Sequence, residues 1–534
     1  MSPELYILAD PALTNKHPAW TAAAIVCYLA LMLFIGYRAY RSTGNIDDYM
    51  LGGRRLPPAV AALSAGAADM SGWLLMGLPG ALYASGLVEA WIAIGLTVGA
   101  WFNWKLVAPR LRSYTEIAGN ALTIPSFLGN RTRDKSGALR IASGIIILVY
   151  FTFYVCSGMV AAGTFTESAF HLNPVWGIVI VGGVTLLYTL FGGFLGATWT
   201  DVAQGLLMLA ALITVPIMAL IQLGGPGAVG QTIADLDAID GLHRLNLFGG
   251  PLTWAGLVAI ISAAAWGLGY FGQPHIIVRF MALRSPAEAK AGRRIGIGWM
   301  ILSAAGAIGA GLIGIAYFAD APLGGRKEQV FLLLAQALFH PLVAGLVLAA
   351  VLAAVMSTMS SQLVVCSSAL VVDLLSLAKS GRYKLSKQQE VLAGRLAVLV
   401  VAVIAFVLSL TAQDTILKLV AFAWAGFGAS FGPVIILSLY WRRLTNWGAL
   451  AGMVTGAVTV FIWGNIPVLT ENLYEILPGF VLNLVVALIV SALTAKPSSA
   501  VTDEFESARQ AALARVAPPG AGAGAGAAKT YQAD

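Results

Sequence analysis

Residues 64–73 read Ser-Ala-Gly-Ala-Ala-Asp-Met-Ser-Gly-Trp, which puts a carboxylate, Asp69, between two glycines of an otherwise apolar stretch. Residues 266–275 read Trp-Gly-Leu-Gly-Tyr-Phe-Gly-Gln-Pro-His, with three glycines and a proline in a second apolar stretch. Each pattern predicts a membrane helix that is broken midway. Two broken helices at matching positions of the two halves of a chain indicate an inverted repeat with a binding site at the membrane midplane.

The composition supports a membrane protein. Of 534 residues, 58% are apolar and 11% are charged, against about 25% charged in a soluble domain. The three cysteines lie in apolar stretches, which excludes a disulfide framework and a CxxC metal site. The sequence contains no HExxH motif, phosphate-binding loop or nucleophile elbow, so it does not indicate an enzyme. The net charge of +7 comes from short basic loops, which indicates membrane topology and not nucleic-acid binding.

Apolar runs predict an all-α polytopic protein with thirteen transmembrane helices. They fall near residues 18–41, 58–83, 87–108, 139–163, 175–195, 201–223, 253–279, 291–318, 342–374, 392–411, 415–440, 447–466 and 476–495. With the N-terminus outside and the C-terminus inside, 27 of the 32 Lys and Arg residues face the cytoplasm, Arg279 among them as a loop residue. This asymmetry follows the positive-inside rule and predicts that orientation.

The predicted spans divide into four parts and a tail. Residues 1–41 are an N-terminal segment with an extra helix, 58–223 are the first five-helix repeat, 253–440 the second, and 447–495 two C-terminal helices. The broken segments are five helices apart, so the two repeats cross the membrane in opposite directions. The Gly- and Ala-rich end predicts a flexible cytoplasmic tail over 496–534.

Asp69 is the most informative polar residue, because an ionisable group at midspan costs at least about 2.5–3.5 kcal/mol and persists where it serves a cation, a proton or water. The alternative is a carboxylate that only bonds to amides of the broken helix. The second polar group, Ser357, Thr358, Ser360 and Ser361, puts four hydroxyls within five residues. Such oxygens suit a hard cation such as sodium. Alternatively, each hydroxyl bonds to a carbonyl one turn earlier.

Several stretches, among them the two broken segments, carry a resemblance to a known family. They are Asn45 to Tyr49 with Gly52-Gly53-Arg54, Ala62 to Gly80, Gly192 to Asp201, Trp266 to Met281, Ala349 to Ser368, and Ala423 to Pro433. In them the chain resembles the sodium:solute symporter family, and within it the carriers of proline. The resemblance implies the inverted-repeat fold shared with neurotransmitter:sodium symporters, sodium as the coupling ion, L-proline as the solute, and a bacterial cytoplasmic membrane.

The resemblance also implies roles for individual residues. Asp69, Ser71 and Gly72 would support sodium or proline binding. Arg54 would be an inside-facing arginine needed for sodium coupling, and Glu328 would belong to an outer lid. Two larger sets are implied as well: sodium ligands at Ala67, Met70, Ala354, Ser357 and Thr358, and proline-binding residues at Trp73, Tyr154, Trp266, Tyr270 and Pro274.

A second sodium position is an open hypothesis. Asp201 with Ser357, Ser360 and Ser361 would form an oxygen shell, and some relatives use these positions for a second sodium. Against this, Asp201 is predicted at the start of a helix, where a carboxylate caps free amides. We favour the interpretation that Asp201 caps a helix, and we therefore expect one sodium to move with each proline.

The predicted function is sodium-coupled uptake of L-proline by alternating access, with membrane lipid as surroundings and no obligatory protein partner. Three alternatives stay open: a sodium symporter of another solute such as pantothenate, a monocarboxylate or a sugar; a transporter-like sensor; and a proton-coupled carrier that titrates Asp69. The short tail, without a signalling segment, disfavours the sensor.

Overall fold

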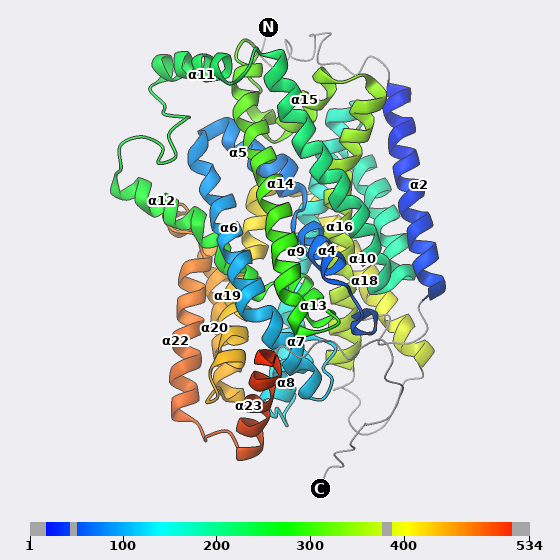
Figure 1. Ribbon diagram of the computed structural model, residues 1–534, viewed down its shortest axis with the longest axis vertical. Helices are drawn as coiled ribbons and strands as arrows, with labels where there is room; N and C mark the ends of the chain where they lie inside the picture. The colour runs from blue at the N-terminus through cyan, green and yellow to red at the C-terminus, as the bar shows by residue number, and fades with distance from the viewer. Residues whose placement is uncertain (1–17, 43–50, 376–386, 515–534) are drawn as a thin grey trace.

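The computed structural model describes residues 18–42, 51–375 and 387–514. The predicted segment 1–17 and the end of the predicted tail, 515–534, lie outside these residues. In the described part every regular element is helical, and the isolated extended contact is a parallel bridge between Leu56 and Leu283. The long helices run side by side along one axis, with α11 and α15 at one end and α8 and α23 at the other (Figure 1).

The described helices follow one another along the chain. Their bounds are α2 Pro18–Ser42, η1 Gly52–Arg54, α4 Pro58–Asp69, η2 Trp73–Gly77, α5 Leu78–Ser85, η3 Leu87–Glu89, α6 Ala90–Phe102, η4 Asn103–Val107, α7 Ala108–Ile117, α8 Ile124–Thr132, α9 Ala138–Phe170, α10 Pro174–Gln222, α11 Pro226–Asp240, α12 Trp254–Ala264, η5 Ala265–Gly272, α13 Pro274–Met281, η6 Pro286–Glu288, α14 Ala289–Tyr317, η7 Gly324–Gln329, α15 Val330–Leu338, α16 Pro341–Ser368, η8 Ala369–Leu375, α18 Lys387–Ser409, α19 Ile416–Tyr440, α20 Asn446–Gly464, α21 Pro467–Thr470, α22 Ile476–Leu493 and α23 Ser499–Leu513.

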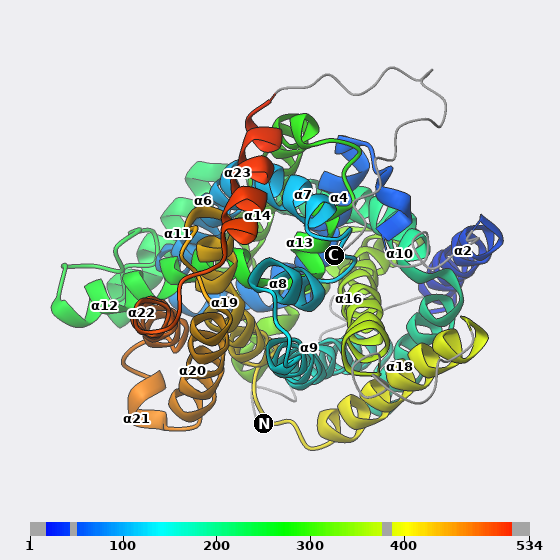
Figure 2. The same ribbon diagram turned by 90° about the horizontal axis from the view of Figure 1, so that it is seen from below.

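Eleven of the described helices are long and apolar enough to cross a membrane. One further candidate is the pair Pro58–Asp69 and Trp73–Ser85, whose halves are bent by 61°, and Pro174–Leu190 is a shorter apolar helix. Seen along the bundle, α13 and α16 lie near the centre, and α2, α18 and α22 lie at the periphery (Figure 2). The central α16 is almost entirely buried, whereas α2 exposes most of its apolar side chains, as expected for a lipid-facing helix.

Both predicted breaks are present. The first α-helical run ends at Asp69, and Met70 then has φ −79° and ψ 76°, outside the helical range. The second break lies between η5 and α13, where Gln273 has φ −80° and ψ 105° and Pro274 opens the new helix. Proline suits that first helical position, because its missing N–H would have no intrahelical partner there.

Glycine lets the second break pack closely against α19. A Cβ on Gly272 would lie 2.2 Å from the carbonyl oxygen of Phe427, a distance that real atoms do not adopt. The broken helix therefore lies with its backbone directly on α19, where a larger residue would force the two helices apart.

Two sequence predictions were wrong in detail. The gap expected at 196–200 lies instead at Gly193, whose φ of 55° and ψ of −153° interrupt α10. Residues 499–513 of the predicted flexible tail form α23, which packs on α7 and buries Val501, Phe505 and Ala508. The Gly- and Ala-rich composition of the last residues hid an apolar stripe with helical spacing in the residues before them.

Candidate functional site

The break after α4 faces the hydroxyls of α16. The Ser357 hydroxyl oxygen lies 2.7 Å from the carbonyl oxygen of Ala67 and 3.1 Å from that of Ala354, and Thr358 donates to the Ala354 carbonyl at 3.2 Å. Met70 is buried at the C-cap of α4, three residues after Ala67. Four of the five predicted sodium ligands are thus joined by hydrogen bonds, and the fifth is on the adjacent turn.

The hydroxyls of α16 also make the local bonds that the alternative interpretation requires. Thr358 bonds to the carbonyl four residues back, and Ser360 donates at 3.0 Å to the carbonyl three residues back. Ser357 differs, because its nearest acceptor, Ala67, belongs to another helix. The contact between Ser357 and Ala67 brings α16 and the broken α4 together at the candidate ion site.

Asp69 is buried beside the second broken helix. One of its carboxylate oxygens accepts a hydrogen bond from the Tyr270 hydroxyl, and the other has no hydrogen-bond partner in the described part of the chain. The bond comes from a side chain and not from backbone amides, so the purely local interpretation of Asp69 does not describe this site. Asp69 and Tyr270 lie 201 positions apart in the chain, one on each broken helix.

Aromatic rings line the same region. The Trp73 and Trp266 ring centroids are 6.2 Å apart, and the Trp73 indole N–H donates to the Asp69 carbonyl at 3.1 Å. The Trp266 ring stacks on Tyr474 at 5.6 Å and on Trp424 at 6.4 Å. The predicted aromatic walls Trp73 and Trp266 therefore lie together, and α19 and the segment before α22 extend them.

Other predicted members of the site occupy the same breaks. Tyr154 of α9 packs edge-on against His275, with ring centroids 5.9 Å apart, next to the start of α13 at Pro274. Ser71 is buried and accepts a long bond, 3.4 Å, from the Trp73 amide. A Cβ on Gly72 would lie 2.9 Å from the Ala161 Cβ, so the break packs tightly on α9.

The candidate second sodium shell is arranged differently from the prediction. Asp201 lies within α10, eight residues after the kink at Gly193, so it is not a helix cap. Its side chain is fully buried and forms an ion pair with Arg279 of α13 at 2.9 Å. Arg279 also donates to Ser361 at 2.6 Å. The prediction that Arg279 is a loop residue at the membrane surface was wrong: its side chain is 1% exposed.

Arg54 lies apart from the ion and substrate residues. Its guanidinium donates to Thr115 at 3.0 Å, to the Met281 carbonyl at 2.9 Å and to the Ala121 carbonyl at 2.8 Å. These partners belong to α7, to the segment after it and to the end of α13, at the end of the bundle that holds α8 and α23 (Figure 1). Arg54 therefore joins the segment before α4 to α7 and to the end of α13. It makes no hydrogen bond to Asp69 or Ser357 in the described part of the chain.

Glu328 lies at the opposite end of the bundle, in η7. Its carboxylate oxygens accept the amides of Ile416 at 3.0 Å and Leu417 at 3.1 Å, the first two residues of α19. A carboxylate at a helix N-terminus satisfies free amides and complements the helix dipole. Burial raises the pKa of Glu328, while the two amide bonds lower it. The expected lid residue thus fastens η7 to α19.

Several residues near the site were missed from the sequence. They are Ser64, Asn103, Gln273, Arg279, Trp424 and Tyr474. Asn103 and Gln273 hold the backbone of the breaks, since Asn103 donates to the Tyr270 carbonyl and Gln273 to that of Trp424, both at 3.0 Å. Of the six, Arg279 left the clearest signal, as a basic residue within the resembling stretch Trp266 to Met281.

The space beside Asp69 is small. A cavity of about 20 Å³ lies among α4, η4, η5 and α14, with Asp69, Tyr270 and Met300 in its lining. That volume holds about one water molecule. An amino acid needs more room, so the walls must move for a solute of that size to enter.

Known proteins are similar to this chain over most of its length. The sodium:solute symporter family matches residues 49–456. The chain is 56% identical over 475 residues to the high-affinity proline transporter PutP of Bacillus subtilis (strain 168), which covers 89% of this chain and 98% of the relative. It is 46% identical over 516 residues to sodium/proline symporter 2 of Staphylococcus saprophyticus, covering 95% and 99%.

A solved structure shares the fold. The substrate-bound outward-open structure of a Na⁺-coupled sialic acid symporter superimposes with a TM-score of 0.75 at 19% identity and covers 90% of this chain and 99% of that chain. At that identity the likeness concerns the fold alone. The family match spans most of the sequence, and the two relatives are aligned over nearly their full lengths. The chain therefore belongs to the sodium:solute symporter family.

Proposed function

We propose that this chain takes up L-proline, driven by sodium that moves inward with it, through alternating access. The named relatives are proline transporters, and their similarity to this chain runs over nearly its whole length. The structural observation that carries the proposal is the 2.7 Å contact between Ser357 of α16 and the carbonyl of Ala67 at the break in α4. Hydroxyl and carbonyl oxygens from two helices converge there as a hard cation requires.

Sodium would bind among the oxygens that the hydrogen bonds of Ser357 and Thr358 now join. The ligands would be the carbonyls of Ala67, Met70 and Ala354 and the hydroxyls of Ser357 and Thr358. Asp69 would supply negative field nearby, with Tyr270 holding its carboxylate. Because those oxygens come from α16 and from broken α4, ion binding would draw the two elements together. The coupling of ion to solute follows if the same movement shapes the adjacent proline site.

Proline would bind against the aromatic walls. Its ring would lie on Trp266 and Tyr270, with Trp73, Tyr154 and Pro274 completing the surface, and its carboxylate would meet amides at a broken helix end. Arg279, the buried cation of α13, is engaged with Asp201. The solute carboxylate would therefore bind backbone amides at a helix end and not a basic side chain.

The membrane arrangement follows from the same proposal. Thirteen spans result when the bent pair and Pro174–Leu190 are added to the eleven long helices. The inverted repeats would be residues 58–223 and 253–440, after an extra N-terminal helix and before two C-terminal ones. The end of the bundle with α8 and α23 carries the basic loops and would face the cytoplasm of a bacterium, while Glu328 would close the outer side.

The driving force is adequate for strong accumulation. A membrane potential of about 100 mV supplies roughly 2.3 kcal/mol per charge. A tenfold sodium gradient adds about 1.4 kcal/mol. Together these support on the order of 500-fold accumulation of proline for each sodium.

The direct test is uptake of radiolabelled L-proline by the purified full-length protein in proteoliposomes, with and without an inward sodium gradient. We expect uptake that depends on sodium and is competed by unlabelled proline. Pantothenate, a monocarboxylate and a sugar are tested as competitors, because a different solute would compete where proline does not. Uptake driven by a pH gradient in sodium-free and lithium-free buffer would instead identify a proton-coupled carrier.

A further inference from the structure

The aromatic wall around Trp266 is extended by a residue that comes late in the chain. Tyr474 lies between α21 and α22, in the segment that leads into the peripheral helix α22 (Figure 2). Its ring stacks on the Trp266 indole, with ring centroids 5.6 Å apart and an interplanar angle of 25°. Tyr474 is 8% exposed, so it belongs to the protein interior and not to the lipid-facing surface.

Two hydrogen bonds fix Tyr474 between two helices. Its hydroxyl donates to the carbonyl of Ala421 in α19 at 2.7 Å, and its amide donates to the Ser262 hydroxyl of α12 at 3.2 Å. Ser262 lies one turn before Trp266, where α12 continues into η5. The tyrosine is therefore bound both to the segment that carries Trp266 and to α19, which packs against that segment.

Trp424 of α19 fixes the backbone at Trp266. Its indole N–H donates to the Trp266 carbonyl at 2.7 Å, and the two indole rings stack with centroids 6.4 Å apart. A Cβ on Gly269 would lie 1.9 Å from the Trp424 indole nitrogen, so η5 already approaches Trp424 as closely as a backbone can. Since Trp266 is anchored in this way, the room beside its indole depends on where the Tyr474 ring is held.

The attachment of α22 to the bundle does not require the hydroxyl of Tyr474. The buried side-chain amide of Asn483 in α22 donates to the carbonyls of Ala429 and Ser430 in α19, at 2.6 and 2.7 Å. The Thr470 hydroxyl donates to Glu475, the N-cap of α22, at 3.0 Å. These bonds hold α22 and its first residue, so the bond from Tyr474 to Ala421 is left to position the ring.

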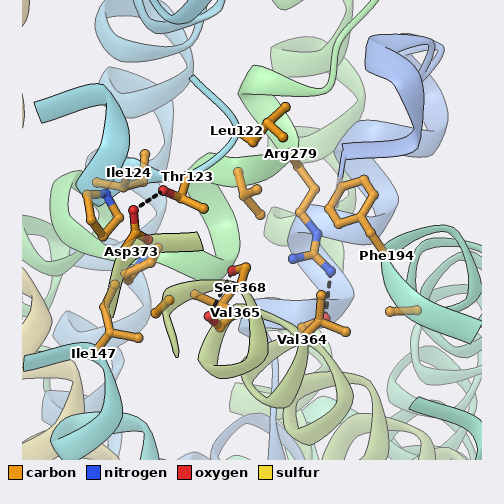
Figure 3. A pocket seen from close by; sticks show the side chains of 16 residues that line it. Leu122, Thr123, Ile124, Ile147, Phe194, Arg279, Val364, Val365, Ser368 and Asp373 are labelled. Carbon is orange, nitrogen blue, oxygen red and sulfur yellow. Dashed lines mark hydrogen bonds between the residues drawn. The ribbon is translucent and has the colours of Figure 1, made fainter. Parts of the chain in front are cut away.

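A cavity elsewhere in the bundle offers no alternative wall for a solute ring. It lies along α13 and α16, and Figure 3 shows Thr123, Phe194, Arg279 and Asp373 in its lining. Its volume is about 20 Å³, which holds about one water molecule. The side chains of Arg279 and Asp373 are 1% and 0% exposed, so two buried charged groups line this space. A hydrocarbon ring is better matched to the aromatic wall of Trp266 and Tyr474.

We propose that Tyr474 determines the ring size of the solute, because it limits the room beside the Trp266 indole to that of a five-membered ring. This role of Tyr474 rests on the proposed function and narrows it to cyclic secondary amino acids whose ring is no larger than that of proline. The bond to Ala421 keeps the tyrosine ring from yielding to a larger solute.

A larger ring is admitted only if Tyr474 moves. Pipecolate, the six-membered homologue of proline, has one additional methylene, and one methylene in an apolar pocket changes kcat/KM about 10–200-fold. Moving the tyrosine breaks its 2.7 Å bond to Ala421, and the loss of that bond opposes binding. Proline fits with the bond intact. The bond therefore counts against pipecolate and not against proline.

The experiment compares the uptake of proline and of pipecolate by the full-length protein in proteoliposomes, under the same inward sodium gradient. Tyr474→Phe keeps the ring and removes the hydroxyl bond. We expect an unchanged proline KM, and a proline-to-pipecolate ratio of kcat/KM that falls about fivefold, the worth of one hydrogen bond. Tyr474→Ala removes the ring, so the proline KM should rise and the ratio should fall by about tenfold or more. Sodium activation should stay that of the parent in both variants.

Tyr150→Phe is the matched control. Tyr150 of α9 is buried, and its hydroxyl donates to the carbonyl of Ala457 in α20 at 2.8 Å, so this variant loses the same kind of bond between two other helices. It should leave the proline-to-pipecolate ratio unchanged. An equal fall of the ratio in Tyr150→Phe would overturn the proposal, because the loss of any such bond would then relax selection.

Two further results would overturn the proposal: equal kcat/KM for the two solutes in the unmodified protein, and the parental ratio in an active Tyr474→Ala variant. If Tyr474→Ala does not fold, the parental ratio in Tyr474→Phe is sufficient to overturn it. Failure of the proposed function is recognised separately, because the unmodified protein would then show no sodium-dependent proline uptake. Sodium-driven proline uptake with a ratio that does not respond to Tyr474 would refute the role of this tyrosine alone.

Discussion

The Ser357 hydroxyl lies 2.7 Å from the carbonyl oxygen of Ala67, which links the centre of α16 to the last turn of α4 before its break. Both residues are proposed sodium ligands, and they are separated by 290 positions in the chain. In this geometry the protein satisfies the carbonyl with its own hydroxyl. Sodium would replace that hydrogen bond with ion coordination by the same two oxygens.

Thr358→Ala should weaken sodium activation of proline uptake by about tenfold, equivalent to about 1.4 kcal/mol, because it removes one proposed ion ligand. Proline KM at saturating sodium should change much less. The measurement is initial uptake rate against sodium concentration. Thr459→Ala serves as the control, since Thr459 of α20 makes the same bond to the carbonyl four residues back, at 2.7 Å. Equal sodium dependence in both variants would refute the ligand assignment.

Asp69→Asn should likewise shift sodium activation by tenfold or more, because it removes the negative field while leaving an acceptor for the Tyr270 hydroxyl. The amide keeps the size of the side chain, so folding should be retained. Sodium titrations of uptake and the thermal stability of the purified protein are the readouts. Sodium dependence like that of the parent protein would show that Asp69 only shapes the break.

Trp266→Ala should raise the proline KM at least tenfold with little effect on the sodium requirement, because the indole is a proposed wall of the solute site. The backbone bond survives the substitution, since the Trp424 indole N–H donates to the Trp266 carbonyl at 2.7 Å. A Trp199→Ala control changes a tryptophan that is 50% exposed on the bundle surface. Normal proline affinity with reduced expression would assign Trp266 to packing.

Glu328→Gln should loosen the lid, because the neutral amide can accept only one of the two α19 amides and loses the favourable charge at the helix N-terminus. Hydrogen–deuterium exchange should then accelerate at Ile416 and Leu417. Asp320→Asn is the control, because it makes the same chemical change at an exposed residue of the segment before η7. Unchanged hydrogen–deuterium exchange in Glu328→Gln would show that this carboxylate does not hold the lid on α19.

The breaks could be predicted because local chemistry determines them. A carboxylate between two glycines, or three glycines followed by a proline, cannot continue an apolar membrane helix without cost. The contact between Asp69 and Tyr270 could be anticipated only from the matching positions of the two breaks. Side-chain partners across helices were otherwise beyond the sequence, since they depend on the tilt of each half-helix.

Arg279 illustrates that limit. It is the fifth residue after the proline that opens α13, so its position in the chain suggests a basic residue at a membrane surface. Its burial follows from where α13 points after the break, toward Asp201 of α10 and Ser361 of α16. A count of charges along the chain contains no information about that direction.

The helix α23 packs on α7 near one end of the bundle. Phe505 packs against Tyr114, with ring centroids 6.2 Å apart. The guanidinium of Arg131 lies 5.2 Å from the centre of the Phe505 ring. Glu504 pairs with Arg133 at 2.7 Å. The helix therefore fastens α7 and α8 at the proposed cytoplasmic end, next to the partners of Arg54.

Phe505→Ala removes the buried ring and should lower the thermal stability of the purified protein by several degrees. Leu513→Ala on the same helix truncates a side chain that is 63% exposed and should leave stability unchanged. Thermal unfolding of both variants in the same detergent is the measurement, and equal melting temperatures would show that α23 contributes nothing to the fold it contacts.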